Sequence, residues 1–390
     1  MSWKRALAVG AALTLALGAC GGDDDDDDDA TEEPSDETTA PDETEETTPP
    51  DGESEGAVTL DQLCEEAKAD GVEAPDGYRV NLVTDIGRVD DGTFNQYSYD
   101  AMEAASDCFG FETSYIETQS EADYASNIAT SLESDPDLII TNGFLITDAT
   151  EAAATENPDI KFIGIDQFLT EYPANMVGVL FREDQGGFLA GAMAALLSES
   201  GVVGVVGGRE DVPPVVKFVN AFKTGAQSIN PEINVLSTYN ESFTDPAKGA
   251  SDAQQFIGEG ADVIFGAGGQ TGSGGVSAAA EQGLWGIGVD QDEYFTTFNG
   301  GEAPGSDKLA TSAVKRVDLA VFRNIVAALD GSFEGGIYTL EAANDGITYA
   351  PFHDADIPDD VAAQLEEVRQ GLADGSIDTG VDPATGEPTS

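Results

Sequence analysis

Short apolar segments rich in valine and isoleucine recur along this chain, and helical patterns lie between them. The apolar segments are residues 79–84, 138–141, 161–165, 202–206, 263–265 and 285–289, and the helical patterns are residues 94–106, 124–132, 186–197, 215–228 and 247–257. Short continuous apolar strands that alternate with helices are typical of parallel sheets covered on both faces. The sequence therefore predicts an α/β fold with doubly wound parallel sheets.

The predicted strands end in polar or glycine-rich steps. These steps include Thr84-Asp85, Thr141-Asn142-Gly143, Ile165-Asp166-Gln167, Gly266-Ala267-Gly268 and Val289-Asp290. Ligands of open α/β sheets bind outside the carboxyl ends of the strands, so these polar groups mark a candidate ligand site. They fall in two sets along residues 58–376, a stretch longer than the roughly 250–300 residues at which one core usually divides. We therefore expect two lobes that face a cleft.

The N-terminus has the anatomy of a secretory signal. A basic start at Lys4 and Arg5 precedes an uncharged apolar run from Ala6 to Leu17. That run is shorter than the about 20 residues needed to span a bilayer. The following Leu17-Gly18-Ala19-Cys20 resembles a bacterial lipobox, which implies a signal peptide over residues 1–19 and a lipid on Cys20, and so an anchor on the extracytoplasmic face of the cell membrane. The alternative is an ordinary signal peptide whose cleavage site contains a cysteine.

Residues 20–57 have the composition of a tether. They contain seven consecutive aspartates, Asp23 to Asp29, and then mainly threonine, glutamate, proline and serine. Such a segment buries too little apolar surface to offset its chain entropy, and its charges repel one another, so we expect a disordered acidic spacer. A calcium-binding loop is the alternative, but it needs spaced ligands with a glycine at the bend. Residues 377–390 are predicted to form a flexible tail.

Charge and cysteine content narrow the possible partners and leave one disulfide open. The chain carries 75 acidic and 16 basic residues, a formal net charge of −59. That excess disfavours nucleic acid, which requires lysine and arginine to neutralise phosphate, and it is compatible with a saline habitat. Apart from Cys20, the only cysteines are Cys64 and Cys108. In an oxidising compartment these two could pair, although the sequence does not show that they meet.

A series of motifs follows in order between Val80 and Arg316. The motifs are Thr84–Gly87 with Asp90–Gln96, Phe181–Gly191, Val206–Gly208, Phe218–Ala226, Ser242–Gly249, Gly260–Phe265, Gly288–Asp292 and Thr311–Arg316. Their order and spacing resemble those of the basic membrane protein family of solute-binding lipoproteins. The sequence departs from the usual family pattern at Thr93, at Arg88-Val89 and at Asn220-Ala221, which affects the ligand detail.

The resemblance implies a type I periplasmic-binding-protein fold, in which two lobes joined by a hinge close over a purine nucleoside. The first lobe is expected at about residues 78–180, with return segments near 306–330. The second lobe is expected at about residues 181–305, together with C-terminal elements.

The resemblance also places the purine between two aromatic walls, Phe94 and Phe243. A purine has two π faces, and each stacking contact is worth on the order of 1–3 kcal/mol in single-strand binders. Phe218 and Phe222 compete for the second wall, although their helical spacing favours packing in the core. The polar groups expected around the base are Asp91, Asn95, whose amide both donates and accepts, and Asp166 as an acceptor from N–H groups.

For the sugar, the resemblance implies Asp290 and Lys315. A carboxylate accepts from two vicinal hydroxyls, and an ammonium donates to a hydroxyl or holds that carboxylate in place. The alternative interpretation is a structural ion pair near the hinge. Gly268 would let the backbone approach the sugar closely. The glycine-rich stretch at residues 266–275 lacks the spacing of dinucleotide and phosphate-loop motifs.

Enzyme functions find little support in the residues. The chain has a single histidine, His353, whereas a Ser-His-Asp hydrolase or a zinc site requires histidines placed beside other reactive groups. We therefore expect no metal, no cofactor and no catalytic residue, with His353 at the surface. A nucleoside hydrolase using Asp90 and Asp91 is the rival enzyme, and a sensor of the same fold that signals to a membrane partner is the rival binding protein.

The favoured function is the lipid-anchored substrate-binding component of an ABC importer. It would bind guanosine, inosine or adenosine and deliver it to permease and ATPase subunits. A pyrimidine nucleoside or an autoinducer-like molecule remains open as the ligand.

Overall fold

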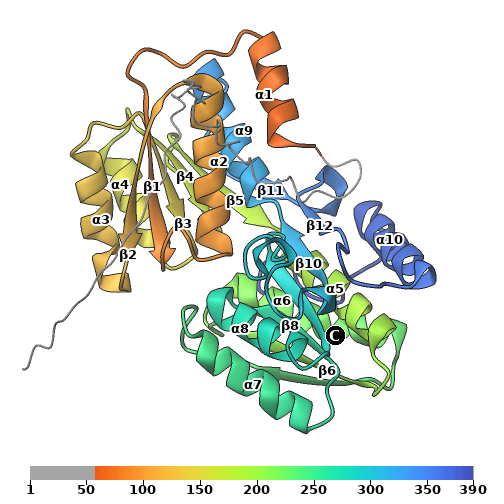
Figure 1. Ribbon diagram of the computed structural model, residues 1–390. Helices are drawn as coiled ribbons and strands as arrows, with labels where there is room; N and C mark the ends of the chain where they lie inside the picture. Colours follow the sequence, from red (N-terminus) through yellow and green to blue (C-terminus); the bar gives the residue numbers. More distant parts are fainter. Residues whose placement is uncertain (1–57, 390) are drawn as a thin grey trace, which may run out of the picture. The chain divides into compact units, whose positions relative to one another are not determined.

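Two six-stranded sheets organise residues 58–389, the part of the chain that this computed structural model describes (Figure 1). The strands of the first sheet are β1 Arg79–Ile86, β2 Glu112–Thr118, β3 Leu138–Asn142, β4 Lys161–Ile165, β5 Met176–Phe181 and β11 Gly336–Leu340. The strands of the second sheet are β6 Val202–Gly207, β7 Asn234–Thr238, β8 Val263–Ala267, β9 Trp285–Asp290, β10 Leu309–Lys315 and β12 Ile347–Tyr349.

The strand order in each sheet is that of a doubly wound α/β lobe. The first sheet runs β11-β5-β4-β3-β1-β2 with every neighbouring pair parallel. The second runs β12-β10-β9-β8-β6-β7, and only the pair of β10 with β12 is antiparallel. The predicted α/β fold is thereby confirmed.

Helices cover both faces of each sheet, as the continuous apolar strands require. On the first sheet, Leu82 packs with the face that holds α2 and α9, whereas its neighbour Val83 packs toward α3 and α4. On the second sheet, Phe265 and Ile264 divide in the same way between α5 with α6 and α7 with α8. The helices are α1 Leu60–Ala69, α2 Phe94–Phe109, α3 Tyr124–Leu132, α4 Thr147–Glu156, α5 Glu183–Leu197, α6 Pro213–Ile229, α7 Pro246–Gly258, α8 Gly269–Ala280, α9 Val317–Asp330 and α10 Asp359–Ala373. Short 3-10 turns lie at Glu121–Asp123, Asn299–Gly301, Ser306–Lys308 and Ala342–Asn344.

The helices α5 and α6 pack at very short range because glycines face the partner backbone. A Cβ atom at Gly187 would lie 2.3 Å from the carbonyl oxygen of Phe218. On the other helix, a Cβ atom at Gly225 would lie 2.2 Å from the carbonyl oxygen of Phe188. Only glycine permits so close an approach. The contact fixes the start of α5 against the side chains of α6, which matters for the charges described below.

The chain passes between the two sheets three times, where β5 leads into α5, β10 into α9 and β11 into β12 (Figure 1). The sequence predicts that the return to the first lobe starts near residue 306. In the structure, β10 pairs with β9, and all seven of its residues are buried, so it belongs to the second sheet. The return therefore begins with α9, which packs against α2, and ends with β11.

The C-terminal segment, expected as a flexible tail, is instead held against the second lobe. The hydroxyl of Thr379 donates to the buried carboxylate of Asp184 over 2.7 Å. The amide of Asn220 donates to the carbonyl oxygen of Gly386 over 2.8 Å. These hydrogen bonds satisfy polar groups on α5 and α6. The prediction of a flexible tail fails here because side chains on distant helices supply the partners.

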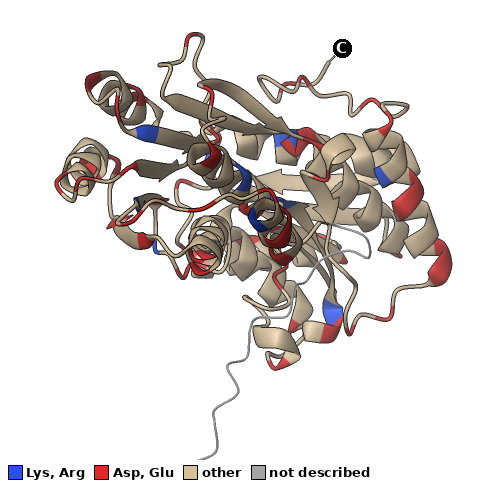
Figure 2. Ribbon diagram, turned by 90° about the horizontal axis from the view of Figure 1, so that it is seen from above, with Lys and Arg blue, Asp and Glu red and all other residues tan. Residues whose placement is uncertain are grey.

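The start of the described region is joined to the first lobe by a disulfide between Cys64 of α1 and Cys108 of α2. The predicted signal peptide, Cys20 and the acidic spacer up to residue 57 lie outside the described residues. Within residues 58–389, no helix is long and apolar enough to cross a bilayer. Figure 2 shows acidic positions spread over helices and loops, with few basic ones among them.

Candidate functional site

A pocket lies where the carboxyl ends of the strands of both lobes meet. All eight residues that the sequence predicts for the ligand line this one pocket. They are Asp91, Phe94, Asn95, Asp166, Phe243, Gly268, Asp290 and Lys315. The pocket is also lined by residues that sequence reasoning did not choose for the site, including Asp85, Ile86, Phe144, Phe218 and Gln270.

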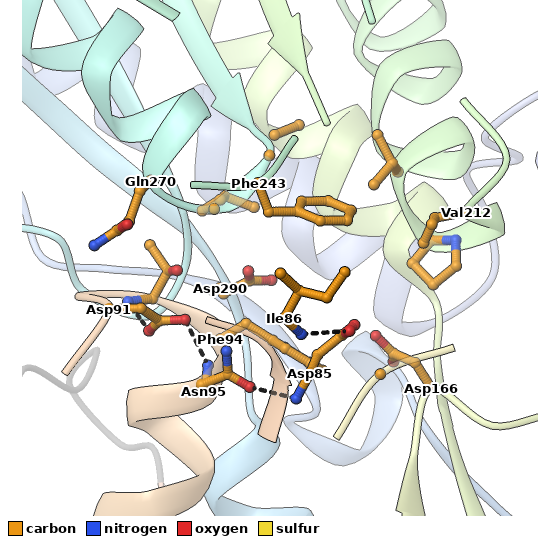
Figure 3. Close-up of a pocket in the computed structure, with 18 of the residues that line it drawn as sticks. Asp85, Ile86, Asp91, Phe94, Asn95, Asp166, Val212, Phe243, Gln270 and Asp290 are labelled. Carbon is orange, nitrogen blue, oxygen red and sulfur yellow. Dashed lines mark hydrogen bonds between the residues drawn. The ribbon is translucent and has the colours of Figure 1, made fainter. Parts of the chain in front are cut away.

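Two aromatic rings, one from each lobe, face the pocket from opposite sides. Phe94 is the first residue of α2, and Phe243 lies in the loop between β7 and α7 (Figure 3). The ring of Phe243 rests against the backbone of Gly208, where a Cβ atom would lie 2.3 Å from the ring. Phe218 also lines the pocket while it packs edge-on against Phe265, with ring centroids 6.1 Å apart.

Phe222, the other competitor for the second wall, is a core residue. It has no exposed surface and stacks on Phe265 with ring centroids 5.3 Å apart.

The loop before α2 is shaped by Asp91. Its carboxylate accepts hydrogen bonds from the backbone N–H groups of Thr93, Asn95 and Gln96 at 2.9, 3.1 and 3.1 Å. Asn95 and Gln96 lie in the first turn of α2, where the N–H groups have no partner within the helix, and Thr93 is the residue before it. Burial raises the pKa of Asp91, against the lowering effect of these hydrogen bonds. Asp91 therefore lines the pocket while it positions Phe94 and Asn95.

The amide of Asn95 is held in one orientation. Its Oδ1 accepts from the backbone N–H of Asp85 over 3.1 Å and from the amide of Asn142 over 3.2 Å. The carboxylate of Asp85 is a further pocket group. Burial raises the pKa of Asp85 to about 6, although its hydrogen bonds from Tyr124 and from the N–H of Ile86 oppose the shift. The signal for Asp85 was its place directly after a predicted strand.

Gly143 makes room for this carboxylate. Its φ is +94°, and a Cβ atom there would lie 2.0 Å from Oδ2 of Asp85. Gly268 has an analogous role between strand ends, since a Cβ atom there would lie 2.4 Å from the backbone nitrogen of Gly208. The close approach that the sequence predicts at Gly268 is therefore also required by the packing of the second lobe itself.

Lys315, at the end of β10, is the cation of the pocket. Its Nζ donates to Oδ2 of Asp166 over 2.6 Å and lies 3.1 Å from Oε1 of Glu183. The sequence predicts Asp290 as its partner, but among the described residues its ion pairs are with Asp166 and Glu183. Asp290 interacts with Lys315 at longer range. The prediction missed Glu183 because nothing in the sequence places the start of α5 beside β10.

Two of the pocket carboxylates belong to residues whose backbone has a positive φ, a conformation that residues other than glycine rarely adopt. Asp166 follows β4 with a φ of +62°, and Asp290 ends β9 with a φ of +68°. Non-glycine residues in this left-handed region are uncommon and cluster at functional sites. In addition, the buried Oδ1 of Asp166 has no hydrogen-bond partner within the described residues. A donor on a ligand would satisfy it.

Burial and the two neighbouring cations set the charges at this end of the pocket. Burial raises the pKa of Asp290 to about 7 and that of Asp166 to about 6, although the attraction of Lys315 opposes both shifts. Burial also acts to raise the pKa of Glu183, but Lys217 and Lys315 outweigh it and hold that pKa below its usual value. Lys315 is buried too, yet Asp166, Glu183 and Asp290 raise its pKa. The ammonium is therefore charged at neutral pH.

Several contacts join the lobes around the pocket. The amide of Gln291 donates to the carbonyl oxygen of Thr93 over 3.0 Å, and the hydroxyl of Thr296 donates to that of Gly92 over 2.7 Å. Arg209, after β6, forms an ion pair with Glu121 of the first lobe. Together with the pairing of Lys315 with Asp166, these contacts describe a closed arrangement of the two lobes.

The residues considered for catalysis lie elsewhere or are otherwise engaged. Asp90 forms an exposed ion pair with Arg88 over 2.9 Å and does not line this pocket. His353 stacks on Tyr294 with ring centroids 4.0 Å apart, and its Nε2 lies 2.6 Å from Oδ2 of Asp292. His353 is an exposed residue, as the sequence predicts, although its side chain alone is 17% exposed. Residues 58–389 contain no cluster of three or more histidine, cysteine or acidic side chains arranged to hold a metal ion.

Comparison with known proteins gives a consistent result. A family model described as ABC transporter substrate-binding protein PnrA-like matches residues 79–368. The ABC transporter nucleoside-binding protein BmpA of Lactococcus lactis is 30% identical, over 68% of this chain and 79% of that protein. Basic membrane protein A of Borreliella burgdorferi is 33% identical, over 69% of this chain and 78% of that protein. The crystal structure of an ABC transporter solute-binding protein from Aeropyrum pernix superposes with a TM-score of 0.69 at 25% identity, over 77% of this chain and 92% of that one.

Proposed function

Because this chain belongs to the basic membrane protein family of PnrA-like ABC transporter substrate-binding proteins, we propose that its two lobes close over a purine nucleoside. Guanosine, inosine and adenosine are the candidate ligands, and an ABC permease with its ATPase is the partner that receives them. One observation carries the proposal. The pocket combines aromatic rings from both lobes, Phe94 and Phe243, with buried carboxylates and an ammonium.

The base fits the aromatic part of this pocket. Phe94 and Phe243 would stack on its two faces, each contributing on the order of 1–3 kcal/mol. Asn95 and the carboxylates of Asp85 and Asp166 supply the hydrogen-bonding groups that a purine edge requires. The buried, unpartnered Oδ1 of Asp166 supports an acceptor role, because a ligand N–H group would satisfy it.

The ribose fits beside the charged groups. Asp290 would accept from vicinal hydroxyls, and Lys315 would donate to a ring or hydroxyl oxygen. Gly268 lets the backbone of the second lobe line the same space. This function breaks no covalent bond of the ligand. The permease would recognise the closed shape of the two lobes.

The proposed location is the outer face of the cell membrane, with a lipid on Cys20. The lipobox-like Leu17-Gly18-Ala19-Cys20 and the acidic stretch after it support this anchor. Replacing the cysteine, Cys20→Ser, should release the protein from membranes without changing nucleoside affinity. Fractionation and mass spectrometry of the N-terminus measure this, and a variant that still carries a lipid would refute the assignment of Cys20.

The ligand is tested on the full chain, purified in detergent. Mass spectrometry of the small molecules released by denaturation should find a purine nucleoside. Calorimetric titration should then show binding of inosine, guanosine or adenosine, weaker binding of 2′,3′-dideoxyinosine, and none of free ribose. A preference for pyrimidine nucleosides or sugars would overturn the proposal. Conversion of inosine to hypoxanthine and ribose would instead support the rival hydrolase.

A further inference from the structure

Four buried charged side chains form a continuous chain from the second lobe to the first. Nζ of Lys217 donates to Oε2 of Glu183 over 2.9 Å, and Oε1 of the same carboxylate lies 3.1 Å from Nζ of Lys315. Lys315 in turn donates to Asp166 over 2.6 Å. Lys217, Glu183 and Lys315 are only 6, 1 and 2% exposed. Lys315 and Asp166 line the pocket, whereas Lys217 and Glu183 do not.

The fold leaves little freedom to the two members that do not line the pocket, Glu183 and Lys217. Glu183 is the first residue of α5, directly after the chain crosses from β5 into the second lobe. Lys217 lies on α6, and the glycine-lined contact between α5 and α6 fixes the two helices at short range. Nζ of Lys217 also lies 3.4 Å from the carbonyl oxygen of Phe181, the last residue of β5. Lys217 therefore also contacts the point at which the chain passes from β5 into the second lobe.

The two oxygens of Glu183 have separate partners, and this division matters for the pocket. Because Lys217 engages Oε2, the carboxylate has one orientation, and Oε1 faces Lys315. The ammonium of Lys315 is thereby fixed 5.0 Å from the ring centroid of Phe94 and 4.8 Å from that of Phe181. Without Glu183, Asp166 of the first lobe would be the ion-pair partner left to Lys315 among the described residues.

We propose that Lys217 and Glu183 are positioning residues of the ligand site, which orient the ammonium of Lys315 without touching the ligand. This inference rests on the proposed function, since it assigns Lys315 to the sugar. The charge of Lys217 keeps Glu183 ionised, and ionised Glu183 holds Lys315 between the two lobes. A ligand that closes the lobes therefore meets a donor already in place, which avoids the free energy of ordering a long flexible side chain on binding.

The proposal predicts a particular pH dependence. The charged groups that face Glu183 are Lys217 from α6, Lys315 from β10, Asp166 after β4 and Asp290 at the end of β9. Removing Lys217 removes a cation that lowers the pKa of Glu183, so that pKa rises. Glu183 then becomes neutral as the pH falls, and Lys315 loses a partner. The affinity lost in the variant should therefore grow toward low pH.

The test compares variants of the full chain by titration with inosine between pH 8 and pH 5.5. Lys217→Met should bind more weakly than the unchanged protein, by about tenfold or more at pH 5.5, the size expected for losing one charge-assisted hydrogen bond. The loss should be smaller at pH 8, where Glu183 stays ionised and only its orientation by Lys217 is removed. Lys217→Arg, which keeps the charge, should recover most of the lost affinity for inosine. Lys223→Met, on the same helix, removes the same charge away from Glu183 and should leave the affinity unchanged.

A double variant covers the case in which Lys217→Met does not fold. Lys217→Met with Glu183→Gln leaves neither an unpaired carboxylate nor an unpaired ammonium at this pair. Its affinity for inosine should be lower than that of the unchanged protein by the same factor at every pH, because no carboxylate remains at residue 183 to titrate.

If the pair is only structural, the variants will lower the melting temperature but bind inosine with unchanged affinity at each pH, which overturns the proposal. Failure of the unchanged protein to bind any purine nucleoside overturns the proposed function instead, and with it this inference.

Discussion

The aromatic walls and the charged end of the pocket are built in different ways. Each wall is fixed by a neighbour, since the cap made by Asp91 places Phe94 and the bare backbone of Gly208 supports Phe243. The charged end draws on five separate places in the sequence, namely Asp166, Glu183, Lys217, Asp290 and Lys315. A ring can therefore be removed with a local effect, whereas removing one charge leaves its buried partners uncompensated.

The largest effect is expected from Lys315→Met, which should lower the free energy of unfolding of the unliganded protein by about 3–5 kcal/mol. The variant leaves Asp166 and Glu183 buried without their shared cation. Urea denaturation of the unliganded protein measures the loss. Lys308→Met removes an ammonium that lies 4.6 Å from the ring centroid of Trp285, and it should cost less than about 1 kcal/mol. Equal losses in the two variants would mean that the charged end is not a cooperative unit.

The next effect concerns pH. The folded protein raises the pKa of Asp290 from 3.8 to about 7, mainly through burial, so the folded state binds more protons than the unfolded state between these values. The free energy of unfolding that Asp290 contributes is therefore present below about pH 4 and lost as the pH rises to about 7.

Asp290→Asn should remove this decline, which is on the order of 2–4 kcal/mol. The stability of the variant relative to the unchanged protein should then rise from pH 4 to pH 7 in denaturant titrations. Asp307→Asn, at an exposed position of the same lobe, is the matched control for the removal of one carboxylate. A constant difference across the pH range would show that Asp290 does not titrate in this way.

The smallest effect is expected from the aromatic wall formed by Phe94, and it should concern ligand affinity alone. Phe94→Ala should weaken inosine binding by about 2 kcal/mol, since one stacking face is lost. The melting temperature of the unliganded protein should change little, because Phe94 is only partly buried. Phe168→Ala is the control, since Phe168 is 54% exposed and does not line the pocket. A loss of stability in Phe94→Ala as large as in Lys315→Met would erase the distinction between wall and charged end.

The same division explains what the sequence could predict. Strand ends can be recognised from local patterns, and the resemblance to the family supplied the residues near them, such as Phe94 and Phe243. The eight residues expected in this way all line one pocket. The pairing of Lys315 with Asp166 joins residues 149 positions apart, and no local pattern encodes it. Glu183 and Lys217 were missed for the same reason, since they depend on how α5 and α6 pack. Asp85 could have been predicted, because the end of its strand can be recognised in the sequence.

The left-handed backbone at Asp166 and Asp290 changes how an alanine scan of this pocket must be interpreted. Alanine at either position would lose the carboxylate and also place a Cβ-bearing, non-polar residue in a conformation that costs roughly 1–2 kcal/mol. Asparagine tolerates that conformation and keeps the shape of the side chain. The difference between the Asn and Ala variants at Asp166 and Asp290 therefore includes this backbone cost together with the loss of the polar side chain, and a scan with alanine alone would attribute both to contacts with the ligand.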